Sequence, residues 1–463
     1  MLAMEAMPLA ARFGRLTLAL VPVSIGVGRL WYLYVAPAAG IPYPYRSVAV
    51  TPTDVLVVLT CVGWLAWRVR TPSRLALPPG TKLIAAALAL LAVAAVATVR
   101  AAVDPLIALG VSVQLALLAL FFFAASELIA SFSVRPLLIG IALAVVAESL
   151  FAVWQTVAQT TASAGVLFNG WAGELAPRAQ GASVVIIPIV GRWLRAYGTL
   201  AHPNILGGFL VLSLAMLGFR RDARTRYLIV VLALGFLAVL LTFSRSAWLA
   251  LLLGAAAMLL MARDVKPSLP KMPARIIVVV AAAAFVLVAL VRVESLGSLV
   301  ERNSIDTRGF YNAVAWRVIG HGVPVGAGNL VMAQQHQLGA ADAGSEPVHD
   351  VFVITLAELG PFGLVAWVAV IGSLLLASWL RRGDPPGRAG PLVAVLVLAP
   401  LLVFDHYLWT QPAGRVLAVL TLVVLTNGST AYGVRAASVA ATRFASPVTA
   451  APIGDLPRRG MPA

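Results

Sequence analysis

The residues best suited to chemistry lie in short polar segments between long apolar stretches. The first segment runs from Arg195 to Asn204 and leads directly into an apolar stretch. Pro203 suits the first turn of a helix, where its missing N–H costs nothing, so His202 and Asn204 lie at a helix N-terminus. Backbone N–H groups and the helix dipole favour an anion there. A helix cap beside an interfacial arginine is the alternative.

A second segment, Thr242-Phe-Ser244-Arg245-Ser246-Ala-Trp248, separates two long apolar stretches by only a few residues. Arg245 therefore stays close to any bilayer that these stretches cross. Its guanidinium is a planar fork of donors that matches phosphate oxygens. Snorkelling to lipid headgroups is the more common role of a lone arginine near a helix end. The hydroxyl groups of Ser244 and Ser246 add donors on both sides, so an anion site stays open beside it.

A third segment runs from His349 to Gly360 and enters another apolar stretch. A histidine titrates near neutral pH and could accept a proton from a hydroxyl group, or Asp350 could hold it in a structural hydrogen bond. Glu358 lies a little over two helical turns further along the chain. Buried carboxylates at that depth are costly and usually paired, so we expect Glu358 to be the structural partner of an arginine.

Residues 306–319 predict a helix in a polar stretch, and this helix bears Arg308, Trp316 and Arg317. The Gly326-Ala-Gly328 sequence that comes after it is a weak signal. It does not follow a strand, so it predicts a tight turn rather than a dinucleotide-binding fingerprint.

Near the end of the eleventh apolar stretch, Asp405 and His406 precede the aromatic residues Tyr407 and Trp409. Interfacial aromatics are expected at a membrane boundary, whereas Asp405 has no such explanation. No two histidines have helical ligand spacing, and no D-x-D pair lies on an outer loop. No metal ion or other cofactor is therefore predicted.

The composition defines the class of protein that carries these segments. Hydrophobic residues make up 61% of the chain, charged residues make up 11%, and the mean hydropathy is +0.94. Soluble domains lack this composition. Apolar runs long enough to cross roughly 30 Å of hydrocarbon recur throughout the chain. Twelve spans are predicted, at residues 16–35, 50–67, 83–99, 105–126, 136–158, 203–219, 227–243, 246–262, 275–291, 350–379, 391–408 and 414–427.

The predicted fold class is an all-α polytopic membrane protein. Strands are not expected, because the runs lack a period of two and an open sheet would leave backbone groups unpaired in lipid. The first run is longer than the apolar region of a signal peptide, and eleven more follow it. The single cysteine, Cys61, lies in the second run, which excludes a disulfide and a zinc or iron–sulfur cluster.

The net charge of +16 could indicate nucleic-acid binding, but the basic residues alternate from loop to loop. The positive-inside rule explains this pattern if both termini are cytoplasmic. Two long loops, 159–202 and 292–349, then face outward and carry arginines against the rule, so function is expected there. We predict one transmembrane domain over residues 1–435 and a disordered cytoplasmic tail over residues 436–463.

Taken in order, these segments resemble the O-antigen ligase and O-antigen polymerase superfamily of membrane glycosyltransferases. The layout of twelve spans, with a mainly helical outer loop between spans nine and ten, also resembles the ligases. The resemblance covers residues 80–425. The resembling positions are R-x2-G-x4-PN at Arg195 to Asn204, SRSAW at Ser244 to Trp248, R-x8-R with P-x-G-x-G-N at Arg308 to Asn329, H-[ND]-x-F with E-x-G at His349 to Gly360, and D-x-Y-x-W-T at Asp405 to Thr410.

The resemblance implies transfer of a glycan from an undecaprenyl diphosphate carrier to an acceptor hydroxyl on the outer leaflet of the inner (plasma) membrane. It implies inversion at the anomeric carbon, with no metal ion. Arg195 and Arg245 would bind the diphosphate, His349 would be the general base, and Arg308 and Arg317 would steer the donor. Further substrate contacts are expected from His202, Asn204, Ser244 and Ser246. One position departs from the family, because Asp350 stands where Asn is usual.

Other functions remain open at this stage. Ligases and polymerases share the donor chemistry and differ in the acceptor, a lipid core or another lipid-linked glycan, and no residue separates them. A lipid or polysaccharide transporter would also have a dozen spans. Its ionisable groups belong near the bilayer midplane, with repeat symmetry, whereas these residues gather at the outer boundary. In a non-catalytic assembly subunit the outer arginines would be dispensable.

Overall fold

The structure is a computed structural model. Most of the ninth predicted span, 275–291, and all of the predicted tail, 436–463, lie outside the residues that it describes. The described part of the chain is mainly helical, as expected, with two short β-hairpins. The described residues are 7–36, 44–71, 77–161, 175–179, 181–187, 190–219, 225–262, 286, 290, 299–339 and 346–427.

Two of the N-terminal helices, α2 and α4, begin at a side-chain cap. Thr51 and Asp54 form a capping box at the start of α2. Asp104 caps α4 by accepting hydrogen bonds from two backbone N–H groups. Both caps pair N–H groups that a helix start otherwise leaves without partners. The helices are α1 (Leu9–Ile25), α2 (Pro52–Arg70), α3 (Thr81–Ala97), α4 (Pro105–Ser131) and α5 (Arg135–Ala158), with short 3-10 turns at Pro44–Arg46 and Val99–Ala101.

The later helices include the elements predicted for the outer loop. Helix α11 contains the helix predicted at 306–319. Gly326 and Gly328 both have positive φ and form the predicted turn. The helices are α7 (Pro203–Gly218), α8 (Thr225–Leu241), α9 (Arg245–Ala262), α11 (Leu299–Gly320), α12 (Leu330–Leu338), α13 (Val351–Leu359), α14 (Pro361–Leu380), α15 (Pro385–Phe404), α16 (Tyr407–Thr410) and α17 (Pro412–Asn427).

Within the described residues, six helices are long and apolar enough to cross a membrane. Four further apolar helices, which belong to α7, α8, α9 and α17, are shorter. Two of these, α7 and α17, are buried almost throughout, so they lie inside the bundle. Large apolar side chains of the surrounding helices face outward, including Val93, Val157 and Val368, which are 62%, 80% and 70% exposed. Such outward faces suit hydrocarbon.

The expectation of a chain without strands is wrong at two antiparallel hairpins. Strand β1 (Trp31–Val35) pairs with β2 (Ser47–Val50), and β3 (Val184–Ile187) pairs with β4 (Gly191–Leu194). Strand β1 falls inside the first predicted span, 16–35, because α1 ends at Ile25. Glycines follow that end, and then a run of aromatic and β-branched residues that favours extended backbone. Side chains of neighbouring helices pair further backbone groups of the hairpins, since Gln114 donates to the carbonyl oxygen of Ala49 and the backbone N of Leu194 donates to Gln159 Oε1.

The tenth predicted span, 350–379, consists of two helices rather than one. Gly360 has φ 69° and ψ −162°, and its backbone N–H closes the last turn of α13. Residues with a side chain rarely adopt this conformation. Pro361 then begins α14, where its missing N–H costs nothing.

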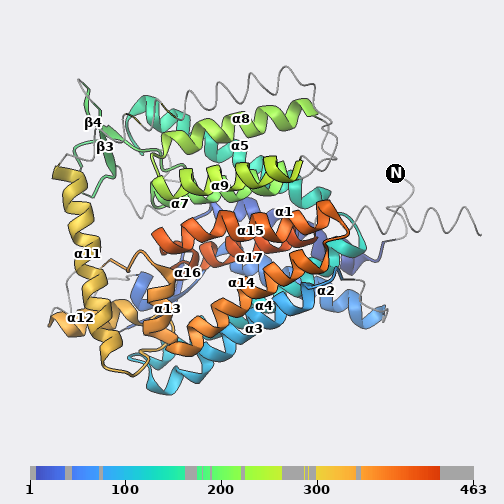
Figure 1. Ribbon diagram of the computed structural model, residues 1–463, viewed down its shortest axis with the longest axis horizontal. Coiled ribbons are helices and arrows are strands. Elements are labelled where there is room, and N and C mark those ends of the chain that lie inside the picture. The colour runs from blue at the N-terminus through green and yellow to red at the C-terminus, as the bar shows by residue number, and fades with distance from the viewer. Residues whose placement is uncertain are drawn as a thin grey trace, which may run out of the picture.

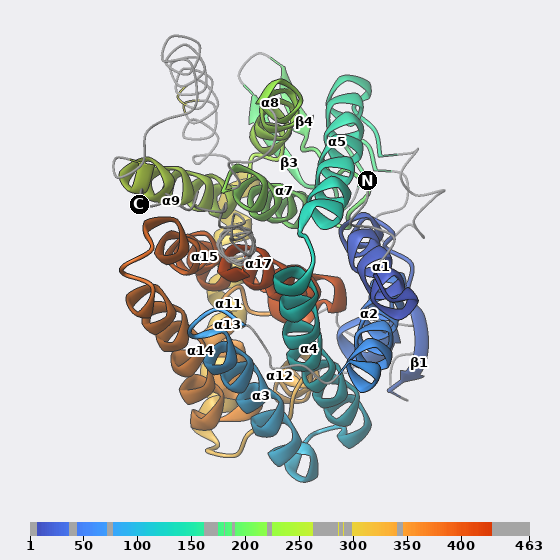
Figure 2. The same ribbon diagram turned by 90° about the vertical axis from the view of Figure 1, so that its right-hand side faces the viewer.

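The long helices run side by side, and α11 lies across one end of them, next to α12 and near β3 and β4 (Figure 1). We call this end the outer end, following the charge pattern. Viewed along the bundle, α7 and α17 lie between the surrounding helices (Figure 2). Backbone hydrogen bonds join outer segments, Val103 to Val325 and Ala196 to Leu241. Loops that the charge pattern assigned to the same side therefore meet in space.

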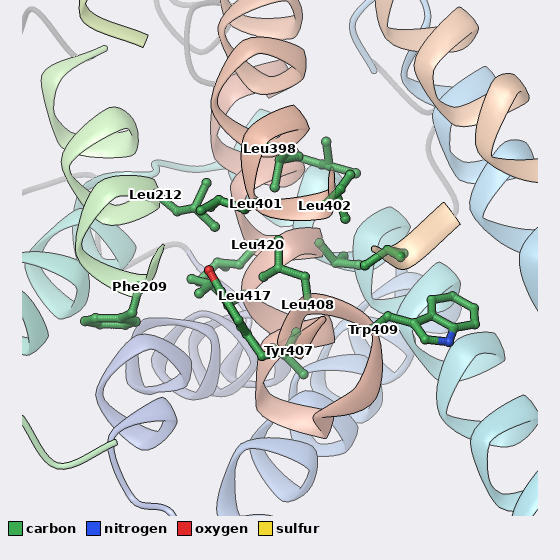
Figure 3. Close-up of a cluster of buried hydrophobic side chains, with 14 of the residues drawn as sticks. Phe209, Leu212, Leu398, Leu401, Leu402, Tyr407, Leu408, Trp409, Leu417 and Leu420 are labelled. Carbon is green, nitrogen blue, oxygen red and sulfur yellow. The ribbon is translucent and has the colours of Figure 1, made fainter. Parts of the chain in front are cut away.

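An apolar cluster fixes α16 against the centre of the bundle (Figure 3). Tyr407 is fully buried, and a Cβ at Gly208 of α7 would meet its hydroxyl oxygen at 1.5 Å. This close packing holds α16, and the residues on either side of it, against the first turns of α7. The labelled side chains are Phe209, Leu212, Leu398, Leu401, Leu402, Tyr407, Leu408, Trp409, Leu417 and Leu420.

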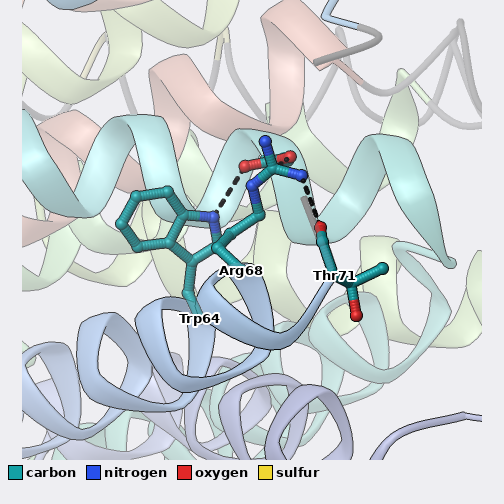
Figure 4. A network of polar contacts seen from close by, with 4 residues as sticks. Trp64, Arg68 and Thr71 are labelled. Carbon is teal, nitrogen blue, oxygen red and sulfur yellow. Dashed lines mark hydrogen bonds and ion pairs between the residues drawn. The ribbon is translucent and has the colours of Figure 1, made fainter. Parts of the chain in front are cut away.

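Polar contacts stabilise the inner end of the bundle, which lies opposite to the outer end. Arg68 of α2 forms an ion pair with Glu127 of α4 at 3.3 Å, and the same carboxylate accepts a hydrogen bond of 2.8 Å from Trp64 Nε1 (Figure 4). Arg381 donates to the carbonyl oxygen of Pro79 at 3.0 and 2.7 Å. Buried charge is tolerated here because each group has bonded partners.

Helices α1 and α2 approach closely through glycine. A Cβ at Gly63 would lie 2.7 Å from the backbone N of Gly14 and 2.8 Å from its Cα. Backbone atoms cannot move aside as a flexible side chain can. Small residues allow such close approach between helices in a membrane.

We predict that Gly63→Ala lowers the melting temperature of the purified protein, because the added methyl group forces α1 and α2 apart, at a cost of about 1–3 kcal/mol. Gly372→Ala is the matched control, since a Cβ at Gly372 meets nothing within 4 Å. Alanine also has the better helix propensity, so this control should melt at or above the wild-type temperature. Equal melting of both variants would contradict the proposed helix contact.

Candidate active site

A cavity of about 520 Å³ lies at the outer end, beneath α11. Six residues singled out in the sequence line it, although they come from different parts of the chain. Ser244, His349 and Arg317, which were also singled out, do not line it. Its lining residues are Gly181, Ala182, Ser183, Val184, Arg195, His202, Asn204, Phe243, Arg245, Ser246, Leu249, Arg308 and Phe404.

Arg195 is held rigidly in the wall of this cavity. Its side chain is 7% exposed. Nε donates to the carbonyl oxygen of Thr242 at 2.7 Å, Nη1 donates to Ser183 Oγ at 2.8 Å, and Nη2 donates to Asn204 Oδ1 at 2.6 Å. All three acceptors are neutral. The guanidinium is therefore oriented without being neutralised by these contacts.

The Ser244–Trp248 turn brings Arg245 to the same cavity. Arg245 is the first residue of α9 and its side chain is exposed. Phe243 precedes this turn with φ 50°, an unusual conformation for a bulky residue that costs on the order of 1 kcal/mol. Ser244 Oγ lies 3.2 Å from Ser246 Oγ. Ser246 thus lines the cavity, and Ser244 supports it from behind.

His202 and Asn204 begin α7, as the sequence predicted. His202 Nδ1 accepts a hydrogen bond of 3.1 Å from the backbone N of Asn204, so His202 is a helix cap. The neutral ring then carries its proton on Nε2. His202 therefore caps the helix, and both residues line the cavity, whereas the binding of an anion there stays a prediction.

His349 lies beside the cavity and is oriented by its own segment. A backbone hydrogen bond to Pro347 engages the ring, and because proline has no N–H, the ring must donate to the carbonyl. The other ring nitrogen then holds the lone pair of the neutral imidazole. Asp350 Oδ1 accepts from the backbone N of Phe352 at 2.8 Å and of Val353 at 3.2 Å, so it caps α13. Asn and Asp serve equally well as caps.

Asp405 and His406 join His349 in a cluster that sequence reasoning missed. The rings of His349 and His406 meet edge to face, with centroids 5.0 Å apart. Asp405 is 3% exposed and accepts a hydrogen bond of 3.1 Å from the backbone N of His406. The unexplained Asp405 was the available signal, but nothing in the sequence linked it to a histidine 56 positions earlier.

The electrostatics of this cluster are dominated by burial and by Arg308. Burial lowers the pKa of His349 to about 2 and that of His406 to about 3, with the positive charge of Arg308 acting in the same direction. The pKa of His202 is also lowered, by burial and then by Arg195, His406 and Arg308. Burial raises the pKa of Asp405 to about 6, against the opposing charge of Arg308. The three imidazoles are therefore neutral at neutral pH.

The same cluster contains the side chains that could hold a metal ion. One ligand atom each from His349, Asp405 and His406 lie within 4.8 Å of one another, which the local spacing of histidines did not predict. Two imidazoles and a carboxylate suit several divalent metals. The field of Arg308 disfavours protonation of both histidines, and it disfavours a metal cation in the same way.

Arg317 lies outside the cavity lining, and Glu358 has hydrogen-bond partners other than the predicted arginine. Arg317 is on α11 with Arg308, but its side chain is exposed outside the cavity lining. Glu358 has no bonded arginine among the described residues. Its carboxylate accepts from Trp409 Nε1 at 2.8 Å and from the backbone N of Leu330 at 3.3 Å. The expected arginine partner is thus wrong, and Glu358 joins α13 to α12 and α16.

Two buried polar residues of α5 position the segment between Arg195 and His202. Gln155 Oε1 accepts from the backbone N of Tyr197 at 2.9 Å and of Gly198 at 2.8 Å. Glu148 Oε2 accepts from the backbone N of Thr199 at 2.9 Å. The sequence held a signal for both, because they are polar residues seven positions apart on one face of an apolar run.

The fold and the cavity define a polytopic helical membrane protein with a cationic, histidine-bearing site at one end of its bundle. Residues 228–368, which include α9, α11, α12 and α13, match the family model of O-antigen ligase. This match confirms the resemblance seen in the sequence and assigns the segment to the O-antigen ligase superfamily. Members of this family are membrane enzymes of the O-antigen ligase or polymerase type. No curated protein matches the chain.

We predict that the protein loses thermal stability when the pH is lowered from about 7.5 to about 5, because unfolded histidines take up protons that the buried imidazoles refuse. Asp405 acts in the opposite sense, since its raised pKa lets the folded protein bind a proton first. His406→Gln should reduce the loss of melting temperature.

His336→Gln is the control for this measurement, because the side chain of His336 on α12 is exposed. It should show the wild-type dependence on pH. If His406→Gln melts with the wild-type dependence as well, His406 does not carry the neutral, buried imidazole described above.

Proposed function

We propose that the chain transfers a glycan from an undecaprenyl diphosphate carrier to an acceptor hydroxyl at the outer face of the inner (plasma) membrane, with both termini in the cytoplasm. One observation carries the proposal, namely that Arg195, Arg245 and Arg308 line a single cavity at the outer end. Three guanidinium groups around one cavity match the charge of a diphosphate.

The proposed reaction is a direct displacement. The acceptor oxygen attacks the anomeric carbon, the bond from that carbon to the diphosphate oxygen breaks, and its electron pair leaves on the diphosphate. The acceptor proton passes to the lone pair of His349, and the configuration of the anomeric carbon inverts. Arg195 and Arg245 stabilise the charge that develops on the departing diphosphate.

The low pKa of His349 fits this role once the donor is bound. Without the negative charge of a donor beside it, burial and the charge of Arg308 make the imidazole a weak base. A bound diphosphate brings negative charge to the arginines, which offsets their field and raises the pKa of His349. The donor thus activates the base, and the acceptor is deprotonated only when a donor is in place.

The remaining predicted residues have supporting roles in this proposal. His202 presents Nε2–H at the start of α7, and Ser246 presents a hydroxyl group at the start of α9. Asn204 holds Arg195, and Ser244 contacts Ser246. Arg317, exposed on α11, would contact the glycan outside the cavity rather than the diphosphate.

The acceptor distinguishes two versions of this function. A lipid core as acceptor makes the chain a ligase, and a second lipid-linked glycan makes it a polymerase that elongates an O-antigen or exopolysaccharide. A transporter is the alternative from another class. The gathering of the arginines at the outer end, rather than half-way along the helices, favours the transferase.

We predict that Arg245→Ala and His349→Ala each lower transfer by about 100-fold or more, since each removes a group that acts in the transition state. The assay incubates purified protein with an undecaprenyl diphosphate glycan and candidate acceptors, and determines the linkage of the product. The acceptor that is used separates ligase from polymerase.

Arg192→Ala is the control, because this arginine on β4 is exposed, donates to the carbonyl oxygen of Pro177, and lies outside the cavity lining. It should transfer at the wild-type rate. Both active-site variants should keep the wild-type melting temperature. Full transfer by a folded Arg245→Ala or His349→Ala protein would remove that residue from the mechanism.

We also predict that transfer is independent of metal ions and continues after treatment with EDTA. The reason is the positive field of Arg308 on the only group of ligand side chains found among the described residues, His349, Asp405 and His406. Loss of activity with EDTA, restored by a divalent metal and absent in His406→Gln, would instead assign a metal ion to this cluster.

A further inference from the structure

A second cavity lies at the outer end, separate in its lining from the arginine-lined cavity. Its volume is about 140 Å³. The chain around it comes from the loop after α1, from β2, from α4, from residues 197–201, and from the start of α17. Most of its walls are apolar, but two charged residues, Arg415 and Glu358, line it. The proposed function gives this arginine no task.

Arg415 is a buried cation without a bonded counter-charge. Its side chain is 6% exposed. Nη2 donates to Gln114 Oε1 at 2.5 Å, and Nε has no hydrogen-bond partner in the described part of the chain. Gln114 is itself oriented by donating to the carbonyl oxygen of Ala49 at 3.0 Å. An amide oxygen leaves the charge of the guanidinium in place.

The nearest carboxylates do not pair with Arg415 either. Glu358 and Asp54 act on it through charge at a distance, and neither forms an ion pair with it in the described residues. Both carboxylates have other bonded partners, Trp409 and Leu330 for Glu358 and Thr51 for Asp54. A buried guanidinium in this state costs several kcal/mol unless an anion accompanies it.

An apolar cavity continues from Arg415 into the bundle. Its volume is about 90 Å³, and its lining is almost wholly aliphatic and aromatic, with side chains of α3, α4, α14, α15 and α17. Arg415 and Trp409 line both this cavity and the outer one. A cation therefore stands where a partly polar cavity meets a hydrocarbon-lined one. This arrangement suits an amphiphile with an anionic group on a hydrocarbon chain.

The outer of these two cavities borders the histidine cluster. Tyr45 lines it and packs edge to face against His406, with ring centroids 5.8 Å apart. Residues 199–201 line it immediately before His202. His202 itself lines the arginine-lined cavity. The histidines thus stand between a cationic cavity on one side and the Arg415 cavity on the other.

We propose that the Arg415 cavity binds the acceptor substrate through a phosphate group on a lipid chain. Arg415 contacts the phosphate, and the aliphatic cavity beyond it takes the first carbons of the chain. This inference rests on the proposed function, in which the arginine-lined cavity takes the donor. The acceptor hydroxyl then reaches the histidines from the side opposite to the diphosphate, as a displacement with inversion requires.

The test measures site-specific labelling of the full-length protein in detergent with a photoreactive decyl phosphate that carries a diazirine on its chain. Labelled peptides are located by mass spectrometry. We expect label on peptides that line the aliphatic cavity, such as those with Leu118 and Leu422. Arg415→Gln should lower this labelling at least about tenfold, as loss of a charge-assisted contact predicts. Arg415→Lys should retain part of it.

Three comparisons decide the outcome. The matching diazirine decanol should label the wild type and Arg415→Gln equally and weakly. If the decyl phosphate probe labels a folded Arg415→Gln protein as strongly as the wild type, the proposed site is wrong. Inorganic phosphate that competes as well as decyl phosphate shows that the ligand is the free ion, which overturns the assignment to the acceptor.

If Arg415→Gln fails to fold, Ala418→Phe tests the site instead, because its side chain fills the aliphatic cavity while Arg415 is retained. It should also lower labelling by decyl phosphate, and unchanged labelling counts against the site. The measurement does not depend on catalysis. If the wild type transfers glycan but wild type and Arg415→Gln are labelled equally, the proposed function stands and the Arg415 site is wrong. If labelling follows the expected pattern but the protein never transfers glycan, the Arg415 site stands and the proposed function is wrong.

Discussion

Positive charge held in the walls of the arginine-lined cavity is the constraint on which the rest of the outer end depends. Arg195 donates hydrogen bonds to carbonyl, hydroxyl and amide oxygens, so these contacts fix the geometry of its guanidinium. The charge of Arg308 reaches His202, His349, His406 and Asp405. A carboxylate bonded to either arginine would weaken that field. In the proposed function, a bound diphosphate adds negative charge to that of the Asp405 carboxylate, on which the charges of Arg308 and Arg195 act.

The bundle holds these charges in place through contacts between distant parts of the chain. The segment around Arg195 is bound to the end of α8 by the hydrogen bond from Ala196 to Leu241 and by Arg195 to Thr242. Helix α5 fixes the next residues through Gln155 and Glu148. The site is therefore a property of the packed outer end, and no single helix carries it.

Apolar periodicity and local caps made most of the helices predictable. The spans around α2 to α5 and α7 to α9 lie close to their predicted positions, because each is a long apolar run bounded by polar or capping residues. The prediction failed where hydropathy alone was the guide. The apolar residues Trp31–Val35 form a strand, and the run at 350–379 contains a glycine with positive φ that divides it. Within the described part of the chain, six helices meet the length and composition of a span and four shorter apolar helices accompany them, so the count of twelve stays a prediction.

The candidate site was predictable as a set of segments but not as a set of contacts. Arg195 and Arg308 lie on loops that carry arginines against the positive-inside rule, Arg245 lies in a short turn between two apolar runs, and all three line one cavity. Their roles stay predictions. The pairing of His349 with His406, and the support from Gln155, depend on tertiary packing between residues far apart in the chain. A single sequence holds no record of such distances.

The division between α13 and α14 has a mechanical consequence. His349 precedes a helix of only nine residues, and that helix meets the long α14 through Gly360, where the chain can turn without distorting a hydrogen-bond ladder. The short helix is fastened instead to α12 and α16 by Glu358. A tilt of α13 would move the imidazole while α14 stayed embedded. In the proposed reaction, where His349 is the base, such a tilt would bring the imidazole to the acceptor and withdraw it without displacing α14.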